Sequence, residues 1–279
     1  MMRCKQSNKG KAYLIIGVLI LAVFLLWSLF PEMFARHDMK ESFRAYQKPN
    51  NEFLLGTNDL GYDIFSELIY AAGTTLLVGV TAALISIVIG ALVGLFAGYS
   101  DGILGDLLNG LIHVFLLIPM LPLIVICSAF FGQNLKNIII IIALLGWCAT
   151  ARAVRARVRQ LKESSFVESL IILGIPRRQI VFKHILPNVT AVISARYILS
   201  VASCMLTESS VSFMGLGDPT VVTWGGMINV AFKRGGFVRG MVYWYLPPGL
   251  CITFCSLAFF LLNQYFTTRS NKANVSYLD

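Results

Sequence analysis

Charged residues are scarce in this sequence. Only 13% of its 279 residues are Asp, Glu, Lys or Arg, whereas 57% are hydrophobic, and the mean hydropathy is +0.73. Soluble domains carry about 25% charged residues, so the composition excludes an ordinary soluble enzyme or binding domain. Apolar runs of about 18 to 25 residues, long enough to cross a bilayer as a helix, recur along the chain. The sequence therefore predicts an all-α polytopic membrane protein.

Several chemical motifs are missing. The chain has no G-x-x-x-x-G-K-[ST] sequence, so it has no phosphate-binding loop of that kind, and we expect no cofactor in it. Its six cysteines form no C-x-x-C pair, and most lie in apolar runs where a thiol packs as a small hydrophobe. The three histidines, His37, His113 and His184, lie too far apart in the sequence to suggest a metal site.

Six apolar runs are interpreted as membrane spans: residues 12–30, 74–99, 107–131, 138–150, 189–207 and 247–266. Four basic residues precede the first run, as in a signal peptide, but no small-x-small cleavage site follows it, so we expect an uncleaved span. The net charge of +9 comes from Lys and Arg beside the runs, which indicates positive-inside topology rather than nucleic-acid binding.

This topology divides the chain into four parts. Residues 1–30 hold a cytoplasmic tail and the first span, and 31–70 form an extracytoplasmic segment with four basic and seven acidic residues. Residues 71–268 form a five-span core, with a cytoplasmic loop at 152–187 and an external loop at 209–245. Residues 269–279 are a cytoplasmic tail. We expect a multi-pass protein of a bacterial inner membrane with both termini in the cytoplasm.

Two spans carry features that affect helix packing. Ser86, Gly90, Gly94 and Gly98 recur every four residues in the second span, which predicts a stripe where another helix approaches closely. The third span contains Pro119 and Pro122, which should kink it. Such a kink fits either a translocation path or simple packing geometry.

The loop at 152–187 is the most basic part of the chain, since residues 152–184 carry eight basic and two acidic residues. The fourth span should continue into it as an amphipathic helix, with a basic face made by Arg152, Arg155, Arg159 and Lys162. Beyond it we expect a short helix over Glu168–Leu173, ended by Gly174 in the left-handed region. A second helix should have Pro176 in its first turn and end at Pro187.

Three acidic positions and one arginine stand out elsewhere. Asp59 and Asp63 lie in an Asx-rich turn before an amphipathic helix, and a metal site made by these two carboxylates is the alternative. Arg196 lies within the fifth span, where a charge is costly and faces a cavity or a partner. It meets an anionic group of the substrate, or it pairs with Glu208 or with a carboxylate of another subunit.

Four motifs, in order, resemble those of a known family. The segment from Glu168 to Pro187 is similar to the EAA loop of ABC-importer permeases, E-A-A-x-x-x-G-x(9)-I-x-L-P, and residues 152–187 are called the EAA loop below. The motifs G-T-N-D-L-G-Y-D, A-R-A-V-R-A-R-V, F-K-H-I-L-P-N and S-F-M-G-L-G resemble the dipeptide, oligopeptide and nickel subfamily, in particular its second, "C"-type permease. Tyr62, the short turn before Trp224 and the missing C-terminal Asp-Pro-Arg depart from that pattern.

The resemblance implies a type I ABC-importer permease fold with six transmembrane helices. It also implies a function as the membrane subunit of an importer for di-/oligopeptides or for nickel or a metal chelate. Its implied partners are a homologous second permease, two ABC ATPase subunits that bind ATP and Mg, an extracytoplasmic solute-binding protein and membrane lipid. ATPase coupling would involve ten residues of the EAA loop: Glu168, Ser169, Gly174, Ile175, Pro176, Arg177, Ile180, His184, Leu186 and Pro187.

Two other classes of function remain as alternatives. An ion-gradient-driven transporter would use Arg196, Glu208 and the two-proline span as its pathway, and inverted repeats between the halves of the sequence would favour it. An intramembrane enzyme would use His113 with Asp101 or Asp106, but no nucleophile lies at a suitable spacing from them. We therefore predict a transport component with no catalytic residue of its own.

Overall fold

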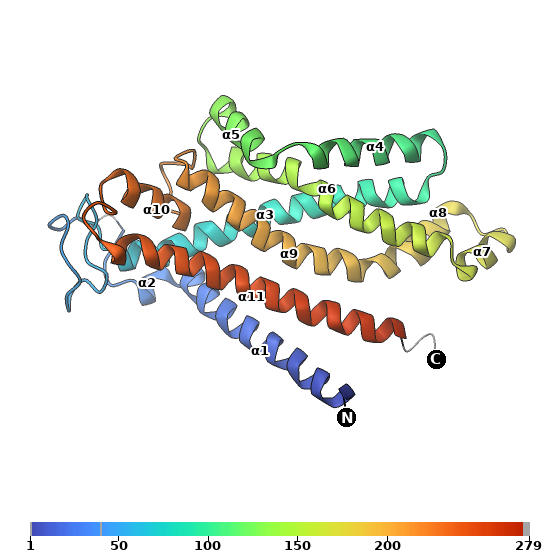
Figure 1. The fold of residues 1–279 in the computed structure, drawn as a ribbon, viewed down its shortest axis with the longest axis horizontal. Helices are drawn as coiled ribbons and strands as arrows, with labels where there is room; N and C mark the ends of the chain where they lie inside the picture. Colours follow the sequence, from blue (N-terminus) through green and yellow to red (C-terminus); the bar gives the residue numbers. More distant parts are fainter. Residues whose placement is uncertain (1, 40, 276–279) are drawn as a thin grey trace.

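The computed structural model describes residues 2–39 and 41–275, and every regular element in that part of the chain is a helix (Figure 1). Residues 276–279 of the predicted C-terminal tail lie outside the described residues. The long helices are α1 (Met2–Leu29), α3 (Ile64–Tyr99), α6 (Leu135–Lys162), α9 (Leu186–Phe213) and α11 (Val242–Val275). The shorter ones are α2 (Pro31–Phe34), α4 (Ile103–Leu117), α5 (Met120–Phe131), α7 (Ser165–Ile172), α8 (Arg177–Gln179), the π-helix η1 (Ile180–Ile185) and α10 (Trp224–Lys233).

Five helical segments are long and apolar enough to span a membrane: Lys11–Leu29, Ile64–Tyr99, Leu135–Lys162, Arg177–Phe213 and Val242–Thr267. The sixth expected span consists of α4 and α5, which are bent by 85° relative to each other, as in a broken span or a re-entrant loop. Pro119 is the residue before α5, and Pro122 lies in its first turn, where a missing N–H removes no helical hydrogen bond. The two prolines therefore lie at a break between two helices of the third span, rather than at a kink within one continuous helix as expected.

The second span is longer than the sequence predicts. It begins at Ile64 instead of residue 74, because the Asp63 carboxylate accepts hydrogen bonds from the backbone N–H groups of Phe65 and Ser66. This N-cap satisfies two of the free donors of the first turn. The first turns of α3 are therefore part of the segment that the sequence assigned to residues 31–70.

The two ends of the helical bundle differ (Figure 1). The segment 35–63, α2, α10 and the loops around α10 gather at one end, whereas α7, α8 and the described ends of α1 and α11 lie toward the other. The two segments predicted to be external therefore share one end of the molecule. The EAA loop lies at the opposite end.

Helices α3 and α6 approach each other closely along the glycine stripe. A Cβ added at Gly94 would lie 2.5 Å from the carbonyl oxygen of Ala151, and one added at Gly90 would lie 2.6 Å from that of Trp147. At Gly98 it would lie 2.7 Å from Cβ of Val158. The glycine stripe thus brings the two backbones together over three helical turns, at distances that no larger residue permits.

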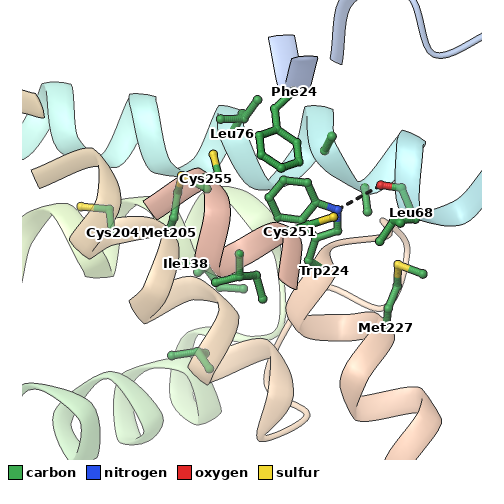
Figure 2. Close-up of a cluster of buried hydrophobic side chains, with 14 of the residues drawn as sticks. Phe24, Leu68, Leu76, Ile138, Cys204, Met205, Trp224, Met227, Cys251 and Cys255 are labelled. Carbon is green, nitrogen blue, oxygen red and sulfur yellow. Dashed lines mark hydrogen bonds between the residues drawn. The ribbon is translucent and has the colours of Figure 1, made fainter. Parts of the chain in front are cut away.

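The main buried cluster surrounds Trp224 at the start of α10 (Figure 2). Its indole Nε1 donates to the carbonyl oxygen of Leu68 at 3.0 Å, and its ring packs against Phe24 with centroids 5.2 Å apart. Cys251 and Cys255 of α11 line the same cluster as free thiols. These cysteines act as small apolar side chains that let α10 and α11 pack on α3.

Candidate functional site

The EAA loop begins as a continuation of α6, which runs without a break from the apolar span to Lys162. Ser164 then caps α7 by accepting a hydrogen bond from the N–H of Val167, so the helix starts three residues before the predicted Glu168. Gly174 has φ +75°, and the N–H of Ile175 bonds back to the carbonyl of Leu170 at 3.1 Å. Gly174 thus ends α7 in the left-handed conformation that the sequence indicates.

The prediction that Pro187 ends the second helix is wrong. The chain is helical from Arg177 to Phe213, and Pro187 lies at the second position of α9. The turns before it widen into the π-helix η1, in which the N–H of Leu186 bonds to the carbonyl of Val181. A wide turn keeps the proline ring from clashing with the preceding carbonyls, and the side chain of Asn188 donates to the His184 carbonyl at 2.7 Å.

The inner face of the EAA loop is held by a second apolar cluster. Its buried members come from five elements: Leu95, Val154, Val158, Val167, Leu170, Ile180, Val181, Ile185 and Val189. The outer face is also apolar but exposed, with Ile172 at 79% and Leu173 at 75% of full exposure. Apolar side chains exposed on a projecting loop are typical of a surface that another protein covers.

An ion pair joins the loop to the end of α3. Lys162 Nζ contacts the Asp101 carboxylate and also donates to the Tyr99 carbonyl at 2.9 Å. The hydrogen bond from Lys162 lowers the pKa of Asp101 from its ordinary value. Arg159 pairs with Glu163 one turn further on, at 3.1 Å, and both side chains are exposed. The residues of the predicted basic face therefore differ in their surroundings. Lys162 is bound to the end of α3, whereas Arg152 is exposed.

The other residues predicted for the EAA loop are mostly accessible. Glu168, Ser169, Gly174, Pro176, Arg177 and Pro187 are exposed, Ile180 is buried, and Ile175, His184 and Leu186 are half-buried. The His184 ring packs edge-on against Phe166, with centroids 5.8 Å apart. The structure thus separates this set into an inner part that anchors the loop and an outer part that is free to contact a partner.

Arg196 and Glu208 are not brought together. Both lie on α9, and the twelve positions between them correspond to about 18 Å along a helix. Glu208 is fully buried, and its carboxylate accepts from Ser212 Oγ at 2.6 Å and from Ser209 Oγ at 3.4 Å. Arg196 is half-buried, and it makes no ion pair with any described residue.

The sequence does not reveal the partners of Glu208. They are hydroxyl groups, including that of Thr223, which caps α10 on the loop that follows α9. A Cβ at Gly225 would lie 2.5 Å from the Ser209 carbonyl oxygen, so α10 approaches α9 closely at this corner. A glutamate followed closely by Ser209 and Ser212 was the only sequence signal for this buried site.

Asp59 and Asp63 have separate contacts instead of a shared metal site. Asp63 caps α3 and lies 3.4 Å from His37 Nδ1, whereas Asp59 pairs with Arg234 at 3.2 Å. Across residues 2–39 and 41–275, no group of three or more His, Cys, Asp or Glu is arranged to hold a metal ion. The two carboxylates therefore stabilise the folded segment at residues 35–63.

The structure also joins the two segments predicted to be external, in a way that no motif predicts. Tyr46 has φ +58°, an uncommon value for a residue with a side chain, and its ring lies 4.0 Å from the Arg239 guanidinium carbon. Its hydroxyl donates to the Arg234 carbonyl at 3.3 Å. Together with the Asp59–Arg234 pair, these contacts bind residues 44–59 to the loop after α10.

The residues proposed for an intramembrane enzyme do not form a site. Asp101 is held by Lys162, while His113 is exposed on α4 about 10 Å further along that helix than Asp106. No described hydrogen bond or ion pair joins His113 to either aspartate.

Comparison with known proteins identifies the family. The family model described as "Binding-protein-dependent transport system inner membrane component" matches residues 90–272, which include α6, the EAA loop, α9 and α10. The chain belongs to this family. The permease is 31% identical over 252 residues to the oligopeptide transport system permease protein OppC of Bacillus subtilis, covering 89% of this chain and 81% of that protein.

Two further relatives support the same assignment. The di/tripeptide transport system permease protein DppC of Pseudomonas aeruginosa is 32% identical over 267 residues, covering 92% of the permease and 86% of the relative. The glutathione transport system permease protein GsiD of Pectobacterium atrosepticum is 29% identical over 248 residues, covering 88% and 81%. The resemblance to C-type permeases of ABC importers is therefore confirmed.

Proposed function

We propose that the permease is one of two membrane subunits of an ATP-driven importer and forms the translocation path with a homologous sister permease. Two ABC ATPase subunits would bind ATP and Mg in the cytoplasm, and an extracytoplasmic solute-binding protein would deliver the substrate. Both termini and the EAA loop would then lie in the cytoplasm. The permease itself would move substrate without catalysing a reaction.

The main support for this proposal is the exposed apolar surface of the EAA loop at the end of α7. Ile171, Ile172 and Leu173 are accessible on a short helix, and the opposite face of that helix is fixed by Val167 and Leu170 in the buried cluster. A rigid element that is anchored on one side and apolar on the other can transmit a partner's movement to α6 and α9. Gly174 would set the angle between its two halves.

The proposed substrates are di- and oligopeptides. The relatives described above are named for oligopeptides, di- and tripeptides, and glutathione, a tripeptide. These names support a peptide substrate over nickel or a metal chelate. Arg196 would face the path, where its guanidinium can meet a substrate carboxylate, while Glu208 would hold the corner between α9 and α10.

Substitution of Gly174 tests the coupling role. A Cβ at Gly174 meets no atom within 4 Å, so Gly174→Val acts only through its left-handed backbone. Gly132, just after the last residue of α5, is a control for backbone strain, since it also has a positive φ of +87° and equally open surroundings. We expect Gly174→Val to abolish peptide uptake by proteoliposomes while ATP hydrolysis by the complex continues, and Gly132→Val to keep the two activities coupled.

Co-purification tests the assembly. The tagged permease, extracted in mild detergent from its own host, should bring with it a second permease and ATPase subunits whose turnover is inhibited by vanadate. A stable homo-oligomer without ATPase activity would contradict the proposal. Normal peptide uptake by Gly174→Val would contradict only the coupling role of the EAA loop.

A further inference from the structure

A pocket of about 330 Å³ opens between the end of α3 and the segment α8–η1. Leu95 and Val181 form its floor, where they are 2% and 8% exposed and belong to the buried cluster of the EAA loop. Phe96 and Phe182 form its walls at the surface, with 48% and 52% of their area exposed. The pocket is therefore apolar inside and open at one side.

Two arginines complete the lining of this pocket. Arg177 and Arg178 are exposed, and neither side chain makes a hydrogen bond or a salt bridge to a described residue. Asp101 interacts electrostatically with Arg177, but its carboxylate already contacts Lys162. The guanidinium groups of Arg177 and Arg178 thus have no direct ion-pair partner among the described residues.

The pocket lies where an apolar span meets the basic loop. Tyr99, which also lines it, is the last residue of α3, and tyrosine is enriched at the level of lipid headgroups. Apolar walls below and guanidinium groups above are the arrangement that an anionic phospholipid requires. A free phosphate ion would leave the aromatic walls uncovered, and an acidic protein segment would leave the apolar floor uncovered.

We propose that this pocket binds one anionic phospholipid, with the phosphate between Arg177 and Arg178 and an acyl chain against Phe96 and Phe182. The bound lipid would fill the space between α3 and the EAA loop and so stabilise the position of the loop relative to the bilayer. The proposal requires that the EAA loop lies at a membrane face and that the ATPase subunits leave Arg177 and Arg178 accessible to lipid, and it can hold or fail independently of the substrate.

The test measures lipid retention by the purified complex. Permease complexes in nanodiscs containing equal amounts of phosphatidylglycerol and phosphatidylcholine would be released into detergent, and the bound lipid counted by native mass spectrometry. We expect one retained phosphatidylglycerol per copy of this chain. Each arginine favours anionic lipid about fivefold, so Arg177→Gln/Arg178→Gln should lower the preference by roughly 20- to 30-fold.

Two further variants distinguish lipid binding in the pocket from general attraction of anionic lipid to positive charge. Arg152→Gln/Lys183→Gln removes the same net charge from exposed positions of the EAA loop that do not line the pocket, and it should retain the lipid. Phe182→Ser keeps both arginines but removes an apolar wall, and it should lose the lipid.

Three outcomes would overturn the proposal. One is equal loss of lipid in Arg177→Gln/Arg178→Gln and in Arg152→Gln/Lys183→Gln, which would indicate charge attraction without a site. Another is full displacement of the lipid by glycerophosphoglycerol, the headgroup without chains, which would indicate a phosphate site. The last is lipid bound to the isolated permease but absent from the assembled complex, which would show that a partner subunit covers the pocket.

Discussion

The indole of Trp224 donates a hydrogen bond to the carbonyl oxygen of Leu68, across 156 positions of sequence, at 3.0 Å. The backbone N–H of Trp224 donates to Thr75 Oγ1 at 3.2 Å, so one residue of α10 contacts α3 at two points about two helical turns apart. Both contacts are buried. They fix α10, in the second segment predicted to be external, to the helix that carries the end of the first.

Replacing Trp224 should therefore weaken the attachment of α10 to α3. Trp224→Phe keeps an aromatic ring but loses the indole hydrogen bond, and the lost bond and volume should cost about 1–3 kcal/mol of stability. The loss of stability would be measured by thermal unfolding in detergent, monitored by the reaction of newly exposed cysteines with a fluorescent maleimide. Trp27→Phe, at a half-buried position of α1, is the control and should shift the midpoint less. An equal shift would contradict the anchoring role of Trp224.

The contact between α3 and α6 predicts a large effect at Gly94. Gly94→Ala would place its Cβ 2.5 Å from the Ala151 carbonyl oxygen, and the helices would have to move apart at a cost of about 1–3 kcal/mol. Gly110→Ala on α4 is the matched control because its Cβ meets no atom within 4 Å. Alanine favours a helix over glycine, so the control should keep or raise the unfolding temperature.

The Asp59–Arg234 pair predicts that loss of either partner will destabilise the protein to a different extent. The Asp59 side chain is 8% exposed and that of Arg234 is 63% exposed, so loss of the arginine leaves a largely buried carboxylate without its partner. Arg234→Gln should therefore destabilise the protein more than Asp59→Asn does. The double variant should recover part of the loss, which a double-mutant cycle of unfolding free energies would detect. Strict additivity of the two effects would rule out the interaction.

Pro187 should determine the width of the turns before it. In Pro187→Ala, residue 187 gains an N–H that can bond to a carbonyl in η1, so the π-helix should tighten toward an α-helix. Hydrogen exchange of the amides in residues 180–190 should slow, because one more helical hydrogen bond protects them. Val189→Ala, at a buried position two residues further on, controls for local changes in packing. Unchanged or faster exchange in Pro187→Ala would contradict this account of the π-helix.

Features set by local residue type could be predicted from the sequence. Hydropathy located the apolar runs, the period of four from Ser86 to Gly98 located the stripe on α3, and Gly174 marked the end of α7. Each of these depends on neighbouring residues or on one helical face. The continuation of α6 into an amphipathic helix followed from the same periodicity.

Features that depend on distant residues could not be predicted. Proline signals a disturbed helix but does not distinguish a kink, a break or a π-turn, and the chain has a break at Pro119 and a π-turn before Pro187. Thr223, one of the hydroxyl partners of Glu208, lies on the loop that follows α9, and Asp59 pairs with Arg234 at the far end of α10. A charged residue in an apolar run indicates that a partner is needed, but only the structure shows which residue that partner is.

The length of α3 has a mechanical consequence. Its 36 residues correspond to about 54 Å of unbroken helix, whereas the hydrocarbon layer is about 30 Å thick. One stiff rod therefore carries the Asp63 cap and the Trp224 anchor near its first residue and leads into the Lys162–Asp101 pair just beyond its last. Because α3 is one unbroken helix, a displacement of its first turn along the axis would be passed on to the base of the EAA loop.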